Sequence, residues 1–143
     1  MSHRLYSLHH PKIPIYKNMG DGRDTYISFY ISSCRIHVFR KTIDEIGDPK
    51  YIRFLVRDEG PSLIMEAYYK KDFQSHRVSP KGSAKHGMEI SSMPLCMLLK
   101  NRLGWDLDKS YRVPGKTYPS QHMAVFDLSA AKEISNTEGD DAK

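Results

Sequence analysis

The chain has few cysteines, no long apolar run and no segment resembling a signal peptide. Its two cysteines, Cys34 and Cys96, are too far apart to follow a metal-ligand spacing, and they fit reduced thiols in a cytosolic protein. No run approaches the roughly 18 apolar residues of a membrane span. Residues 1–4 lead into no apolar signal-peptide core. We therefore expect a cytoplasmic protein with no membrane partner.

The short motifs of common catalytic sites are also missing. The sequence contains no Gly-x-Ser-x-Gly, no P-loop and no Gly-x-Gly-x-x-Gly. None of the seven histidines forms His-x-x-x-His or pairs with a cysteine at zinc spacing. Acidic pairs such as Asp44-Glu45 and Asp58-Glu59 fit helix starts or turns better than paired-carboxylate catalysis. We expect a protein that is not an enzyme and that needs no cofactor and no metal.

The charge is unevenly distributed along the chain. Lysine and arginine number 22 against 17 acids, which gives a net charge of +5. Glu138, Asp140 and Asp141 lie in the small, polar stretch 132–143, which we interpret as a disordered acidic tail. The rest of the chain is correspondingly more basic. This favours an acidic partner, nucleic acid first, although an ordinary solvated surface explains the same charge.

Composition divides the chain into segments ahead of that tail. Prolines and glycines in residues 1–24 predict an irregular arm, and residues 25–69 form a first structured half. Residues 70–87 are a basic connecting segment, and residues 88–131 form a second half.

The first half alternates in the way that half-buried strands do. Ile27, Phe29 and Ile31 alternate with more polar residues, which places one face inward. Gly47 suits a left-handed stop to a short helix. The expected order is strand, strand, short helix, strand, strand, at residues 26–32, 35–39, 41–46, 51–56 and 63–68.

The second half repeats part of this order. A strand at 88–90 precedes a helix that begins after an N-cap at Ser91-Ser92, has Pro94 in its first turn and ends at Gly104. Strands at 111–113 and 123–128 follow across a loop. The prediction is a β-rich α+β protein of two related βαββ halves, with chance alternation in a β-rich chain as the alternative.

Residues 26–68 resemble the AbrB/MazE-type swapped-hairpin DNA-binding module. Arg35–Val38 lies where that family has its Gly-Arg-Val-Val-Ile-Pro strand, and Ile46-Gly47 lies on its Leu-Gly. The chain departs from the family at Cys34, which replaces a turn glycine, and at Phe39, which replaces a proline.

In that family two modules interleave into one β-rich body. The resemblance therefore implies that a chain with two copies forms a pseudo-dimer or a small barrel, as a monomer or a homodimer. It also implies a DNA-binding regulator of bacterial or mobile-element type. The DNA-contacting residues would be basic side chains of the strands and the connecting segment: Arg23, Arg35, Arg40, Lys41, Arg53, Lys70, Lys71 and Arg77.

Aromatic residues leave a second function open. Tyr68, Tyr69 and Phe73 accompany the lysines of the connecting segment, where they could stack on bases or pack on a strand. Trp105, directly after the helix-ending Gly104, fits a hydrophobic cap on that helix. As the alternative, Trp105 and Tyr111 could anchor a protein partner. The alternative hypothesis is therefore a protein-binding modulator, an inhibitor or adaptor of a recombinase or a host defence complex.

Overall fold

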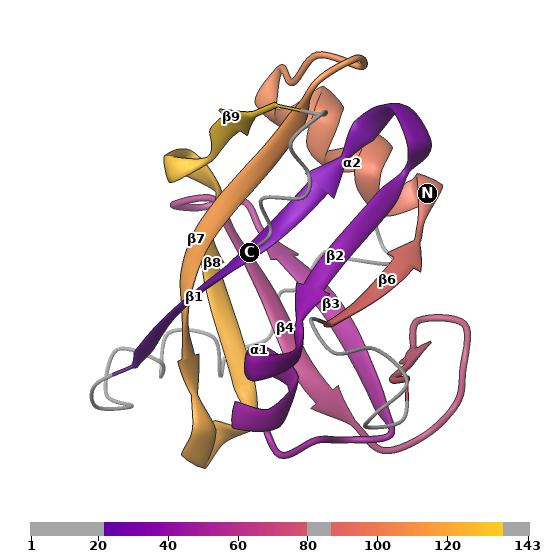
Figure 1. The fold of residues 1–143 in the computed structure, drawn as a ribbon, viewed down its shortest axis with the longest axis vertical. Helices are drawn as coiled ribbons and strands as arrows, with labels where there is room; N and C mark the ends of the chain where they lie inside the picture. The colour runs from indigo at the N-terminus through magenta and orange to yellow at the C-terminus, as the bar shows by residue number, and fades with distance from the viewer. Residues whose placement is uncertain (1–21, 80–86, 136–143) are drawn as a thin grey trace.

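The computed structural model describes residues 22–79 and 87–135. These residues form a nine-stranded antiparallel sheet that curls into a nearly closed, barrel-like body with short helical segments (Figure 1). The expected β-rich α+β class is confirmed.

The first part of the chain has the element order that its alternation predicts. The elements are β1 (Arg23–Tyr30), β2 (Arg35–Phe39), α1 (Arg40–Glu45), β3 (Tyr51–Arg57) and β4 (Ser62–Tyr68). A 3-10 turn at Ile31–Ser33 joins β1 to β2, and Cys34 ends it with a φ of 55°. This left-handed conformation is one that glycine adopts more readily than cysteine.

The second part differs from prediction at two places. Its elements are β5 (His76–Arg77), β6 (Gly87–Ser91), α2 (Met93–Leu103), β7 (Ser110–Tyr118), β8 (Met123–Asp127) and β9 (Lys132–Ile134). The strand β7 continues through Pro114 and Gly115, where a loop was expected, because β1 pairs with it on one side and β8 on the other. The start of the expected disordered tail instead forms β9, which pairs with β7.

The helix α2 begins and ends at the predicted residues. The Ser92 hydroxyl accepts a hydrogen bond from the Leu95 N–H at 3.3 Å, which satisfies one of the free donors of the first turn. Gly104 closes the helix in the left-handed conformation. The buried side chains Leu95 and Leu99 place one face of α2 on the core.

Strands from the two expected halves alternate within the sheet. The order is β5-β3-β4-β8-β7-β1-β2-β6, with β9 added on β7. The strand β1 pairs with β7 from Arg23↔Thr117 to Tyr30↔Ser110. Residues of both parts, among them Phe29 and Phe126, lie fully buried in one core cluster. The two expected halves therefore share a single hydrophobic core.

Candidate nucleic-acid interface

The arginines of the first strand pair lie on the surface and face carboxylates. Arg35 Nη1 lies 2.7 Å from Glu89 Oε1, with 46% of each side chain exposed. Arg23 Nη1 lies 3.6 Å from Glu45 Oε2, and 65% of the Arg23 side chain is exposed. Exposed pairs of this kind contribute little to stability, but they compete with a phosphate for the guanidinium.

Arg53 is more firmly engaged than the arginines of β1 and β2. Its Nε donates to Glu66 Oε2 at 2.5 Å across the β3–β4 pair. Its guanidinium carbon also lies 4.5 Å from the centre of the Tyr68 ring. Arg53 therefore supports the sheet surface more than it offers a free charge.

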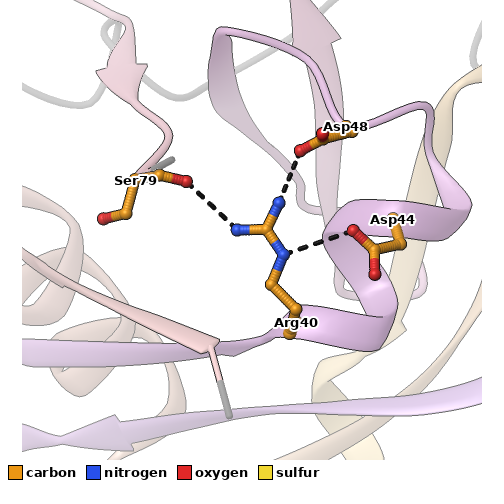
Figure 2. Close-up of polar contacts among 4 residues, drawn as sticks. All are labelled: Arg40, Asp44, Asp48 and Ser79. Carbon is orange, nitrogen blue, oxygen red and sulfur yellow. Dashed lines mark hydrogen bonds and ion pairs between the residues drawn. The ribbon is translucent and has the colours of Figure 1, made fainter. Parts of the chain in front are cut away.

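Arg40 is the least available of the predicted DNA contacts (Figure 2). Its Nε lies 3.2 Å from Asp44 Oδ1, its Nη2 lies 2.5 Å from Asp48 Oδ1, and its Nη1 donates to the Ser79 carbonyl at 3.1 Å. Only 11% of this side chain is exposed. This corrects the expectation that Arg40 contacts DNA. Its three contacts instead join α1 to the segment after β5.

The remaining predicted cations are exposed and form no ion pair within 22–79 and 87–135. A further lysine with the same property, Lys50, was missed by sequence reasoning because it stands alone before a strand. We call this set the basic end: Lys41, Lys50, Lys70, Lys71 and Arg77.

Strand pairing brings the members of the basic end together. Tyr51, next to Lys50, pairs with Tyr68 on one side and with Arg77 on the other. The Val78 N–H also donates to the Lys50 carbonyl at 2.8 Å. In Figure 1, α1 and the connection that follows β4 lie at the same, lower end of the barrel.

A hollow opens on the same surface. Its volume is about 330 Å³, and its lining includes Lys50, Tyr51, Arg77 and Ser79. Asp48 also lines the hollow, but Arg40 holds its carboxylate. The hollow therefore combines unpaired cations with an acid that is already neutralised, which suits an anionic group.

The turn after β4 is built around Asp72. Its carboxylate accepts hydrogen bonds from the Tyr68 hydroxyl and from the Gln74 N–H, each at 2.9 Å. Desolvation raises the pKa of Asp72, but these hydrogen bonds and the charge of Lys70 outweigh it and lower the pKa. The same hydrogen bond to Asp72 is the main reason that the pKa of Tyr68 is raised.

A further arginine, Arg112, lies on β7 within the strand predicted at 111–113, but it was not among the predicted DNA contacts. The Arg112 guanidinium carbon lies 5.3 Å from the Tyr26 ring centre and 5.8 Å from that of Phe39. Its Nε donates to Ser28 Oγ at 3.4 Å. Arg112 thus lies beside two aromatic rings on the β1–β7 pair, and the strand pairing brings these distant residues together.

The two predicted protein anchors are buried. Trp105 is 8% exposed and Tyr111 is 6% exposed. Their rings stack with centres 4.4 Å apart, and Trp105 also packs at 5.6 Å on Phe29. The Asp106 N–H donates to the Tyr111 hydroxyl at 2.8 Å. This corrects the expectation for both residues, because core side chains cannot act as surface anchors.

Three further observations frame the functional argument. In the described ranges, no helix is long and apolar enough to cross a membrane, and no group of three or more His, Cys, Asp or Glu side chains is placed to hold a metal ion. Comparison with protein-family models, with curated proteins and with solved structures gives no match.

Proposed function

We propose that this protein is a non-catalytic DNA-binding regulator that contacts the phosphates of duplex DNA through its basic end. The observation that carries the proposal is that exposed cations gather there while the nearby acids Asp48 and Asp72 are engaged within the fold. Four of these five cations are lysines, which act as point charges and favour sequence-tolerant phosphate contact over base reading.

The resemblance to the swapped-hairpin module supports the same proposal. The order strand, helix, strand, strand occurs at β2-α1-β3-β4 and again at β6-α2-β7-β8. Equivalent strands also pair with each other in antiparallel fashion, β2 with β6 at His37↔Glu89 and β4 with β8 at Ile64↔Val125. Where equivalent strands meet at a two-fold axis, they pair with each other in antiparallel fashion, as these do. We therefore propose a tandem duplication whose copies interleave as a pseudo-dimer.

The proposal predicts salt-dependent binding that depends on the basic end. With fluorescence anisotropy on a mixed-sequence duplex, we expect affinity to fall steeply between about 50 and 200 mM salt. The double substitution Lys71→Gln, Arg77→Gln removes two exposed cations without breaking an ion pair between residues that the structure describes. Each lost phosphate contact reduces the slope of log affinity against log salt by about 0.9, so the slope should fall by about 1.8.

A matched control separates local contact from total charge. Lys100→Gln with Lys132→Gln makes the same change in net charge on α2 and β9, at the other end of the barrel in Figure 1. We expect the control to bind with nearly the wild-type slope. Equal losses in the two variants would contradict the assignment to the basic end, and no binding at the lowest salt would reject DNA as the partner.

A second candidate function, protein binding, is favoured by the outer face of α2. Met93, with 64% of its surface exposed, lies beside Pro94, Met97 and Leu98 along a groove of about 460 Å³. The helix has no acidic residue and carries two cations near its end, Lys100 and Arg102, of which Arg102 is paired with Asp58. An apolar groove beside positive charge suits an acidic amphipathic helix.

This candidate predicts binding of a labelled acidic amphipathic model peptide. Met93→Glu with Leu98→Glu places two acids in the groove, and we expect affinity to fall at least about tenfold through lost apolar contact and charge repulsion. Leu107→Glu is the control, because Leu107 is 53% exposed and lies outside the groove. If anisotropy shows the same affinity for all three proteins, the groove is not the binding surface.

A further inference from the structure

Two aromatic rings project from the basic end into solvent. Tyr69 is 81% exposed and Phe73 is 79% exposed, the highest values among the large hydrophobic side chains that the structure describes. Both flank Lys70 and Lys71 in sequence. Large apolar rings left in water beside unpaired cations point to a binding function, since neither ring contributes to the core.

The rings stand on an ordered turn. The Asp72 N–H donates to Ser75 Oγ at 2.9 Å, and the Ser75 N–H donates to the Asp72 carbonyl at 3.2 Å. With the bonds from Tyr68 and Gln74 to the Asp72 carboxylate, these contacts fix the backbone between the two rings. A ligand that stacks on the rings therefore does not have to order the whole turn first.

Tyr69 also continues a row of side chains in contact, although its ring is tilted against that of Tyr68. Arg53 lies over the Tyr68 ring at 4.5 Å, the Tyr68 and Tyr69 ring centres are 5.1 Å apart, and Lys70 Nζ lies 5.8 Å from the Tyr69 ring centre. Phe73 has no ring contact within the described ranges. The Phe73 ring is therefore accessible to a ligand, and it lies on the same turn as Tyr69 and Lys70, which end that row.

We propose that Tyr69 and Phe73 stack on unpaired bases, so that the basic end prefers single-stranded or locally opened nucleic acid over intact duplex. This inference rests on the proposed function, because the cations of the basic end hold the phosphates in both cases. Paired bases in a duplex are stacked on each other and present only their edges, whereas unpaired bases present a face to an aromatic ring. The rings therefore add binding energy only where bases are free.

Nucleic acid fits this surface better than an anionic membrane does. Exposed rings with lysines also occur on proteins that bind bilayers. Here the Asp72 carboxylate lies between the two rings in sequence, and its lowered pKa keeps it ionised. If the turn inserted into an anionic membrane surface, the Asp72 carboxylate would enter that surface together with the two rings. The negative potential of the lipids would repel the carboxylate and oppose insertion.

The experiment uses the full chain and three probes: a labelled mixed-sequence single strand without self-complementarity, the duplex of the same sequence, and vesicles of phosphatidylcholine with phosphatidylserine. We expect the wild-type protein to bind the single strand more tightly than the duplex. Tyr69→Leu with Phe73→Leu keeps apolar side chains but removes both aromatic faces. Its single-strand affinity should fall at least about tenfold, while its duplex affinity changes less than about twofold.

Each alternative outcome has a distinct meaning. Equal affinity for the two nucleic acids, or no loss in the ring variant, overturns the stacking inference and leaves salt-steep duplex binding as support for the proposed function. Lys71→Gln with Arg77→Gln should weaken both nucleic acids, which separates the charges from the rings. Binding to vesicles but to neither nucleic acid would overturn both proposals.

Discussion

Gly87→Ala is expected to destabilise the protein by at least about 3 kcal/mol. Gly87 has a φ of +150°, and a Cβ there would lie 2.0 Å from the Val38 carbonyl oxygen. That oxygen belongs to β2, the strand with which β6 pairs through Phe39↔Gly87. Backbone cannot move aside as a flexible side chain can, so the β2–β6 pairing must break at this end.

Urea unfolding followed by the fluorescence of the single tryptophan measures this loss. Gly104→Ala is the control, because Gly104 also has a positive φ, of +69°, but no atom lies within 4 Å of the added Cβ. It should cost only about 1–2 kcal/mol for the left-handed conformation. Losses of the same size at Gly87 and Gly104 would show that φ alone, and not the contact with Val38, decides the effect.

Trp105→Ala is expected to cost about 3–5 kcal/mol of unfolding free energy. The ring fills the space between Tyr111 and Phe29, so its removal leaves a cavity in the shared core. The loss is measured by thermal or urea unfolding followed by circular dichroism, since this variant has no tryptophan.

The control for Trp105→Ala is an aromatic residue at the surface. Tyr69→Ala removes a ring that is 81% exposed, and it should change stability by less than about 0.5 kcal/mol. A surface anchor at Trp105 would give the reverse pattern, with stability kept and partner binding lost. A Trp105→Ala protein as stable as the wild type would restore that hypothesis.

Local pattern was enough to predict several elements of the fold. Alternation along Arg35–Phe39 places Ile36 and Val38 inside, and both are fully buried in β2. Ser92 and Gly104 define the ends of α2 through capping, which acts over a few residues and can be read without a tertiary structure. The exposed cations at Lys70 and Lys71 follow from a polar connecting segment in the same way.

Features that depend on distant partners could not be read from the sequence. Pro114-Gly115 has the composition of a turn, yet strands on both sides hold it within β7. Arg40 has two acids nearby in sequence, Asp44 and Asp48, but its third contact, with the Ser79 carbonyl, lies far along the chain and depends on the fold. Trp105 follows a helix end, where the sequence is compatible with both a hydrophobic cap and a surface anchor, and the packing of Phe29 and Tyr111 around it makes it a core residue.

The pairing of β1 with β7 delays completion of the fold until most of the chain has left the ribosome. The partners of β1 residues on β7 lie 80 or more positions downstream, such as Val113 for Ile27. If β1 and β2 pair first, both outer edges of that hairpin stay open until β6 and β7 are made, and open edges can pair with other chains. Closing such distant contacts is slow compared with local helix formation. The sheet order thus makes synthesis of the C-terminal strands the step that protects the N-terminal ones from aggregation.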